Sequence, residues 1–386
     1  MENQEIRKRN QVLLELMLGA SDRAFWNETI GMTEESLRQI DDDAWKNIDT
    51  AFIVGHGTSL ATAYNAETYL SHIAGLRARA LPAYEFRSYP DDYVKSPETT
   101  LVIGCSCSGN TVSVVKSLEI ARGMGCKTLC LSGDGDIGGA KAAEYRIVAD
   151  CAIEKRGATS HPYSVSHLFL LIGAYKLSIR IGQSRSVLTA QKAAYWEEQL
   201  EKALGALTFL PELSEQMARI AGDARARGAV NQIVLGTGPN HGTMVEGALK
   251  ICEFIWKLGA GEELEDFAHG RFRELDQITP LMMICPSGAS VDKAMDILAG
   301  AAIAGSNTVI FTDAPTEAME KLATTIVRMP ALEDEYLTPF VYVFAFWLYG
   351  YHYMADAGEL VGGARYGLLA TDINFKAHFD AHGNHL

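Results

Sequence analysis

The strongest constraint on the fold of this chain is a pattern of short apolar runs separated by helical stretches. In the first half, such runs begin at Ala51, Leu101, Lys127 and Tyr145, and a helical pattern follows most of them. This alternation is typical of a parallel β-sheet that is covered by helices on both faces. We therefore expect an α/β fold of the doubly wound type.

The same pattern occurs a second time further along the chain. Leu101 and Leu281 begin corresponding runs 180 residues apart, and Tyr145 and Thr325 begin another pair at the same interval. A repeat of this length is too long for a solenoid unit, so it predicts two tandem α/β domains. The boundaries we expect are a helical N-terminal segment at 1–48, a first domain at 49–184, a helical linker at 185–228 and a second domain at 229–386.

Composition narrows the range of partners. The net charge is −14 and no basic block occurs, which argues against nucleic acid or a membrane as the main partner. Seven cysteines, an odd number without a Cys-x-x-Cys pair, indicate buried reduced thiols and a cytoplasmic location. The N-terminus lacks the pattern of a secretory signal. The apolar stretch Pro339–Met354 is shorter than a membrane span and predicts a buried core helix.

Two loops at the expected carboxyl ends of strands are candidates for an anion site. The first contains Gly57, Thr58 and Ser59, and the second is the Ser106–Thr111 loop. The candidate residues of the second loop are Ser106, Ser108, Gly109, Asn110 and Thr111. Hydroxyls and free backbone N–H groups at the start of a helix bind phosphate, although the same residues also serve as simple helix caps. Because both loops belong to one sheet, we expect a phosphate site in the first domain.

A second candidate feature is the stretch from Thr243 to Gly270. Helical periodicity predicts a helix from Thr243 to Leu258, stopped by Gly259–Gly261 and followed by an acidic loop. Glu253 on this helix and His269 in the loop would form a carboxylate–imidazole pair suited to proton transfer. The alternatives are a solvated ion pair between Glu253 and its lysine neighbours, and a histidine that only forms a turn.

The motifs for common cofactors are incomplete. Gly55-His-Gly57 resembles the start of a dinucleotide fingerprint, but Leu60 replaces the third glycine and the following acidic residue, Glu85, lies too far along the chain. The histidines have no spacing typical of metal ligands. We therefore expect neither a cofactor nor a metal.

Taken together, four motifs resemble one known family. The segments GHGTS, AYEFRSY, SCSGNT and ALKICE, the last followed by HG after 15 residues, occur in this order within a duplicated α/β chain. The arrangement is similar to the double sugar-isomerase (SIS) domain family, in particular to the isomerase half of glucosamine-6-phosphate synthase and to fructosamine-6-phosphate deglycases. The resemblance covers roughly residues 48–376 and implies two tandem doubly wound SIS domains.

The resemblance also implies roles for individual residues. The two hydroxyl-rich loops would hold a sugar 6-phosphate, and Glu253 would move a proton between C1 and C2 of the open-chain sugar. His269 would open the sugar ring or act as a second acid or base, and in the synthase it comes from the neighbouring subunit, which implies a homodimer or a higher homo-oligomer. Lys376 is the candidate for a lysine that covers the sugar. Arg271 replaces the proline usual after His-Gly and would meet an acidic part of the substrate.

These implications lead to a functional hypothesis with two rivals. We expect a deglycase or isomerase acting on an amino- or N-substituted sugar 6-phosphate, with fructosamine 6-phosphates favoured. A glucosamine-6-phosphate deaminase/isomerase is the alternative, and a non-catalytic sugar-phosphate sensor is the rival from another class. No glutaminase segment precedes the repeat in this sequence, so we do not expect glutamine-dependent synthesis.

Overall fold

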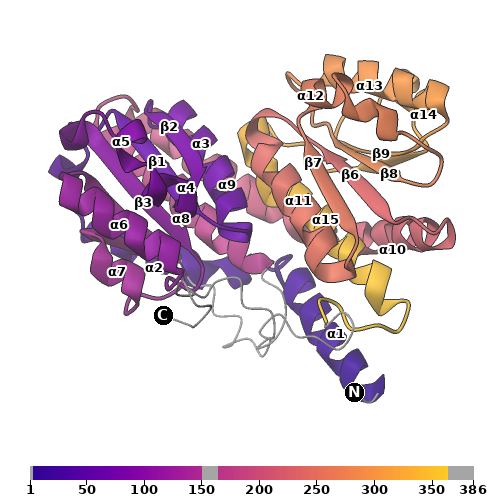
Figure 1. The fold of residues 1–386 in the computed structure, drawn as a ribbon, viewed down its shortest axis with the longest axis horizontal. Coiled ribbons are helices and arrows are strands. Elements are labelled where there is room, and N and C mark those ends of the chain that lie inside the picture. Colours follow the sequence, from indigo (N-terminus) through magenta and orange to yellow (C-terminus); the bar gives the residue numbers. More distant parts are fainter. Residues whose placement is uncertain (1–2, 150–163, 364–386) are drawn as a thin grey trace, which may run out of the picture.

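The protein has an α/β fold with two five-stranded parallel sheets (Figure 1). The structure is a computed structural model that describes residues 3–149 and 164–363. The first sheet has the order β2-β1-β3-β4-β5. Its strands are β1 (Thr50–Gly55), β2 (Arg77–Pro82), β3 (Thr100–Ser106), β4 (Lys127–Ser132) and β5 (Tyr145–Val148). The order reverses direction at β1 and β3, so the carboxyl ends of these two strands form the switch point where ligands bind in such sheets.

The second sheet has the order β10-β9-β8-β6-β7, and all its pairings are parallel. Its strands are β6 (Asn231–Leu235), β7 (Leu258–Glu262), β8 (Pro280–Ile284), β9 (Asn307–Thr312) and β10 (Thr325–Arg328). Read from β7, the second sheet has the order β7-β6-β8-β9-β10, which matches the order β2-β1-β3-β4-β5 of the first sheet strand by strand. The switch point of the second sheet therefore lies at the carboxyl ends of β6 and β8.

Helices precede, connect and cover the strands. Those of the first half are α1 (Asn3–Gly19), α2 (Ala24–Arg38), α3 (Thr58–His72), α4 (Ala83–Ser88), α5 (Pro90–Tyr93), α6 (Val112–Met124), α7 (Gly138–Ala142) and α8 (Val165–Ser184). Those that follow are α9 (Ala190–Ala206), α10 (Leu210–Ala226), α11 (His241–Ile255), α12 (Leu264–Ala268), α13 (Val291–Ala304), α14 (Glu317–Leu322) and α15 (Pro339–Ala355).

The two halves contact each other through α3 and α11. A Cβ added at Gly242, in the first turn of α11, would lie 2.0 Å from Asn65 Oδ1 and 2.4 Å from the carbonyl oxygen of Ala61. Asn65 Nδ2 also donates a hydrogen bond of 2.8 Å to the carbonyl oxygen of Pro239. Only a glycine at position 242 allows this close approach, which brings the later turns of α11 to the start of α3.

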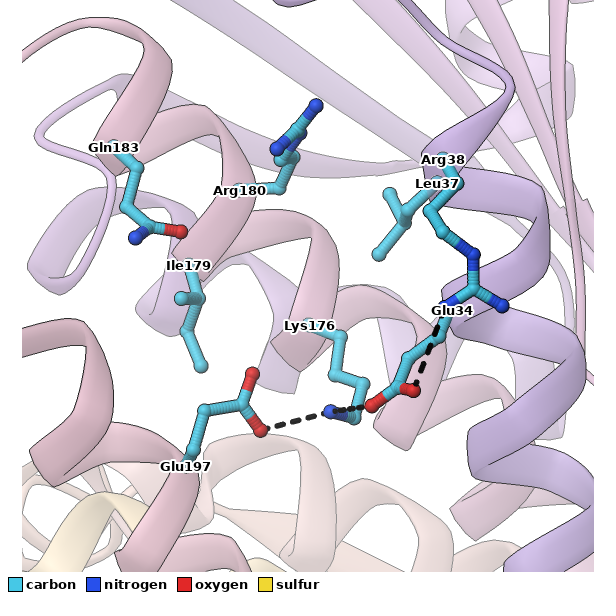
Figure 2. Close-up of a pocket in the computed structure, with 8 residues that line it drawn as sticks. All are labelled: Glu34, Leu37, Arg38, Lys176, Ile179, Arg180, Gln183 and Glu197. Carbon is cyan, nitrogen blue, oxygen red and sulfur yellow. Dashed lines mark hydrogen bonds and ion pairs between the residues drawn. The ribbon is translucent and has the colours of Figure 1, made fainter. Parts of the chain in front are cut away.

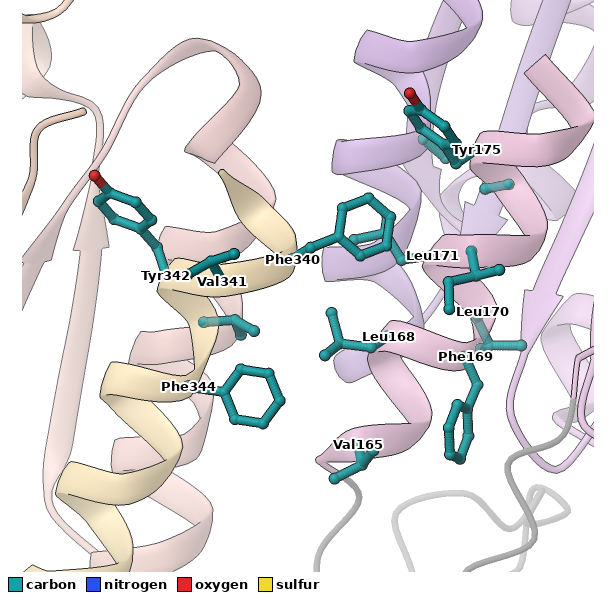
Figure 3. Close-up of a cluster of buried hydrophobic side chains, with 14 of the residues drawn as sticks. Val165, Leu168, Phe169, Leu170, Leu171, Tyr175, Phe340, Val341, Tyr342 and Phe344 are labelled. Carbon is teal, nitrogen blue, oxygen red and sulfur yellow. The ribbon is translucent and has the colours of Figure 1, made fainter. Parts of the chain in front are cut away.

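The longest apolar helices, α8 and α15, form the centre of the core (Figure 3). Phe340 of α15 meets Tyr175 of α8 edge to face, with ring centroids 5.9 Å apart. By length and composition α8 could cross a membrane, but 94% of its apolar window is buried inside the protein, as in a core helix. The prediction that Pro339–Met354 is buried is confirmed. Helices α10 and α11 of the same chain cover α15.

The N-terminal helices dock on different parts of this body. Asn10 of α1 donates to the carbonyl oxygen of Glu359 and accepts from the N–H of Val361, close to the end of α15. Helix α2 packs on α8. Between α2, α8 and α9 lies a cavity of about 170 Å³, where the buried Lys176 Nζ is 2.8 Å from both Glu34 Oε1 and Glu197 Oε2 (Figure 2). This cavity contains none of the predicted site residues.

Two sequence predictions need correction. Helix α11 ends at Ile255 rather than at Leu258, and the segment we expected to be a helix stop and loop is strand β7, Leu258–Glu262. A Cβ at Gly259 would lie 2.2 Å from the carbonyl oxygen of Ala248, so the glycine is needed because β7 lies directly against α11. Cys252 is also exposed, whereas Cys105, Cys126, Cys130 and Cys285 are buried as expected.

Candidate functional site

The two predicted phosphate loops meet at the switch point of the first sheet. The N–H of Cys107 donates to Ser59 Oγ at 3.3 Å, which joins the loop after β1 to the loop after β3. Gly57 has a φ of +55°, and α3 begins at the next residue, Thr58. The backbone N–H groups at the start of α3 therefore lie beside the second loop, in the arrangement that binds anions.

Within the second loop, the predicted residues divide into two kinds. Ser106 Oγ accepts from the N–H of Gly109 at 3.1 Å and lies 3.0 Å from Thr111 Oγ1, so these side chains order the loop. A Cβ at Gly109 would lie 1.3 Å from Ile137 Cδ1, which requires glycine there. The side chains of Ser108 and Asn110 are exposed, so they are the groups of this loop that a ligand can reach first.

Lys250, one of the lysine neighbours of Glu253 in the sequence, connects Glu253 with the first loop, Gly57–Ser59. Lys250 Nζ donates to Thr58 Oγ1 at 2.7 Å and to Glu253 Oε2 at 2.6 Å. Lys250 is fully buried, whereas 38% of the Glu253 side chain is exposed. The bond between Lys250 and Thr58 spans 192 residues of sequence, so no local pattern could have predicted it.

A second carboxylate lies on the buried side of Lys250. Glu246 Oε1 is 3.3 Å from Lys250 Nζ and accepts from Trp347 Nε1 at 3.1 Å. Burial, partly opposed by the charge of Lys250, raises the pKa of Glu246 to about 7. Burial also acts to lower the pKa of Lys250, but the charges of Glu246 and Glu253 outweigh it and the pKa is raised. The lysine therefore stays charged next to Glu253.

His167 is a further buried side chain near Lys250. Its Nδ1 lies 2.9 Å from Thr62 Oγ1, one turn after Thr58 on α3. Burial, with a further contribution from the charge of Lys250, lowers the pKa of His167 to about 3. The imidazole is therefore neutral at physiological pH and adds no second cation beside Lys250.

The structure does not bring His269 and Glu253 together within the chain. His269 is 73% exposed and its Nε2 lies 3.0 Å from Glu265 Oε1. Arg271 pairs with Glu262 and lies 3.6 Å from Glu274 Oε1. Lys376 lies outside the described residues. Strand β7 and helix α12 lie between Glu253 and His269 along the chain, so the two residues are not held near one turn.

The arrangement combines the two candidate phosphate loops with a carboxylate that is accessible on one side and fixed by a buried cation on the other. Such a carboxylate is suited to accept a proton from a substrate whose anionic group is held a short distance away. Over residues 3–149 and 164–363, no group of three or more His, Cys, Asp or Glu side chains is placed to hold a metal ion.

Comparison with known proteins finds relatives among the isomerizing glutamine–fructose-6-phosphate aminotransferases. No family model matches the chain. A glutamine–fructose-6-phosphate aminotransferase (isomerizing) of Thermococcus kodakarensis is 25% identical over 335 residues, which cover 84% of this chain and 52% of that protein. The chain thus spans about half the length of the curated relatives it matches.

Solved structures share the fold along nearly the whole chain. The C-terminal domain of glucosamine-fructose-6-phosphate aminotransferase from Francisella tularensis superposes with a TM-score of 0.76 at 18% identity, covering 89% of this chain and 95% of that one. Glucosamine-6-phosphate deaminase from Thermotoga maritima gives a TM-score of 0.62 at 16% identity, covering 90% and 96%. Sequence and fold together confirm the resemblance of this chain to the sugar-isomerase (SIS) family, including the isomerase half of glucosamine-6-phosphate synthase.

Proposed function

We propose that the chain consists of two tandem SIS domains and is a cytoplasmic enzyme that acts on an amino- or N-substituted sugar 6-phosphate, with Glu253 as the proton-transfer base. The observation that carries this proposal is the bridge from Thr58 through Lys250 to Glu253. It links the start of the candidate phosphate loop to the candidate base through one buried cation. Binding energy from the phosphate is thereby used to align carbons that react some distance away.

The favoured reaction is removal of the amine from a fructosamine 6-phosphate. In this substrate C1 carries the amine and C2 is the ketone carbon. Glu253 takes a proton from C1 to give an enaminol, and return of the proton to C2 gives an imine at C1. Water then adds to C1, the amine leaves, and glucose 6-phosphate remains. The steps consume one water and need no oxidant or reductant, so a carboxylate and a second acid or base are sufficient.

We assign His269 the part of the second acid or base, supplied by a neighbouring copy of the chain. Its side chain is 73% exposed and pairs with Glu265 within the part of the chain that the structure describes, which leaves it accessible to a partner. A symmetric dimer would give each site one Glu253 and one histidine from the other subunit. Lys376 stays a prediction for the group that covers the sugar.

One observation favours the alternative reaction, deamination of glucosamine 6-phosphate. The guanidinium of Arg271 is already engaged by Glu262 and Glu274. An arginine that is paired in this way is less available to bind an acidic leaving group. A small leaving group such as ammonia is therefore more suitable. The substrate panel below separates the two reactions.

The test is a coupled assay for release of hexose 6-phosphate from fructosamine 6-phosphates and from glucosamine 6-phosphate. Glu253→Gln should lower turnover at least about a hundredfold, as loss of a general base does, and His269→Ala should lower it by a similar factor. Glu317→Gln is the matched control, since that carboxylate is 92% exposed and lies on α14. Sugar-phosphate binding without turnover on any substrate, with variants that behave like wild type, would instead identify a sensor.

A further inference from the structure

The switch point of the second sheet contains a cavity to which the proposed reaction gives no role. It has a volume of about 310 Å³ and lies at the carboxyl ends of β6 and β8, between the starts of α11 and α13. Its lining includes Asn240, Ser290, Lys293 and Glu335. A volume of about 300 Å³ is at the lower end of the range for small-molecule sites, so it suits a ligand of monosaccharide size.

Two buried polar atoms in the lining have no partner. Ser290 is 8% exposed and precedes α13, yet its Oγ neither caps that helix nor contacts any described group. Asn240 is 2% exposed, and its Oδ1 is also unpartnered. Buried polar atoms are normally hydrogen-bonded, so these two indicate a missing ligand or water.

The orientation of the Asn240 amide follows from its neighbours. Thr338 Oγ1 donates its only hydrogen to the carbonyl oxygen of Glu335 at 2.6 Å. It must therefore accept from Asn240, which places Nδ2 at the 2.7 Å contact with Thr338 and leaves Oδ1 free. An amide oxygen accepts hydrogen bonds but cannot donate one. A ligand that satisfies Asn240 must consequently carry N–H or O–H donors.

The loop of the second half is closed to anions by carboxylates of the chain itself. Asp313 accepts from the N–H of Ser287 and from its Oγ, both at 2.6 Å. The carboxylate of Glu335 accepts from the N–H of Ala289 and lies so close to Gly288 that a Cβ there would be 2.1 Å from Oε2. The N–H groups of Ser287 and Ala289 are therefore already paired with negatively charged carboxylates, which would repel an anion.

The charges that line the cavity favour a cation. Glu263, Glu265 and Glu335 contribute three carboxylates against one lysine. That lysine, Lys293, already lies 2.7 Å from Glu265 Oε2 and 3.5 Å from an oxygen of Asp296. An anionic ligand would meet net negative charge, whereas an ammonium group would be stabilised.

We propose that this cavity binds a small hydroxylated primary amine without phosphate, of the amino-sugar class. The ammonium group lies near Glu335, and hydroxyl or ammonium hydrogens satisfy Asn240 Oδ1 and Ser290 Oγ. This assignment does not depend on the reaction proposed for the first sheet, because it uses different loops and different residues.

Isothermal titration calorimetry on the full chain in an amine-free buffer tests the assignment, with glucosamine, glucose and glucosamine 6-phosphate as probes. Glucosamine should bind saturably and glucose about tenfold more weakly, because it lacks the ammonium. Ser290→Ala and Glu335→Gln should each weaken glucosamine binding about tenfold, while Ser106→Ala in the Ser106–Thr111 loop and Glu317→Gln on α14 should not. The thermal midpoints of all variants establish that they are folded.

Three results would overturn the proposal. The first is an absence of saturable glucosamine binding to the folded wild-type chain. The second is glucose binding as tightly as glucosamine, which would remove the ammonium from the argument. The third is glucosamine binding that is lost in Ser106→Ala and kept in Glu335→Gln, which would place the ligand at the first sheet.

Discussion

Replacement of Lys250 by methionine should destabilise the protein in a pH-dependent way. Lys250 lies fully buried between Glu246 and Glu253, and methionine keeps most of its length without its charge. Removal of one partner from a buried ion pair costs about 3 to 5 kcal/mol, because the other charge stays buried without compensation. Glu253 is partly exposed and keeps contact with water, so the main effect falls on Glu246.

The size of the pH dependence follows from the proton on Glu246. The folded-state pKa, about 7, is above the unfolded value, so the stability from this proton is present at low pH and is lost as the pH rises through 7. Without Lys250, whose charge lowers this pKa, the folded-state pKa of Glu246 should rise further. Each pH unit above 7 then adds about 1.4 kcal/mol to the difference between wild type and variant. Between pH 6 and pH 9 the difference in unfolding free energy should therefore widen, by about 1 kcal/mol or more.

Urea unfolding at pH 6 and pH 9, followed by tryptophan fluorescence, measures this difference; Trp347 contacts Glu246 directly. The matched control is the double variant Glu246→Gln with Lys250→Met, which has no fully buried carboxylate beside position 250. It should recover part of the lost stability, and its difference from Glu246→Gln alone should be the same at both pH values. If the free energy of unfolding of Lys250→Met is below that of wild type by the same amount at pH 6 and at pH 9, the buried pair of Lys250 and Glu246 is not the origin of the effect.

Three further predictions concern the site and the interface between the halves. The variants Glu253→Gln and His269→Ala, each inactive alone, should together give about a quarter of wild-type turnover when the two chains are co-expressed. Random pairing makes half of the dimers mixed, and each mixed dimer has one intact site. No recovery would mean that both residues act within one chain. Ser106→Ala should raise KM for the sugar phosphate about tenfold in initial-rate assays, with a smaller change in kcat. The reason is the loss of the hydrogen bonds that order Gly109 and Thr111. An unchanged KM would contradict a phosphate role for this loop. Gly242→Ala should lower the free energy of unfolding by about 1 to 3 kcal/mol, because the added methyl group overpacks against α3. Gly300→Ala on α13, where the added methyl group has open space, should not lower it. Urea unfolding measures both variants.

The sequence was sufficient to predict the strands that lie inside the sheets or carry apolar runs, and it failed at one edge of each sheet. Strands β2 and β7 lie at these edges. Arg77–Pro82 begins with exposed and half-buried residues, and Leu258–Glu262 has no fully buried residue. An edge strand is held by the backbone of its neighbour on one side only, so its residues need not be apolar. Periodicity therefore contained no signal for β2 or β7.

The candidate site was predictable where it depends on topology. Parallel strands place their carboxyl ends at one edge, so hydroxyl-rich loops after β1 and β3 had to be neighbours, and the hydrogen bond between Cys107 and Ser59 agrees with this. The role of Lys250 was not predictable, because a lysine three residues before a glutamate is usually a solvated pair on a helix surface. The burial of Lys250 depends on how closely α11 approaches α3. The absence of a Cβ at Gly242 allows this close approach.

The two sheets also explain why a hydroxyl-rich or glycine-rich loop does not by itself determine the charge of its ligand. In both halves a loop after the third strand in sequence leads into a helix whose N–H groups attract negative charge. In the first half the contacts of Ser106 are with groups of its own loop. In the second half Asp313, 26 residues beyond Ser287 and just after β9, takes the N–H and the hydroxyl of that serine. A carboxylate from outside the loop thus occupies the position of an anion, and the space beside it becomes suited to a cation.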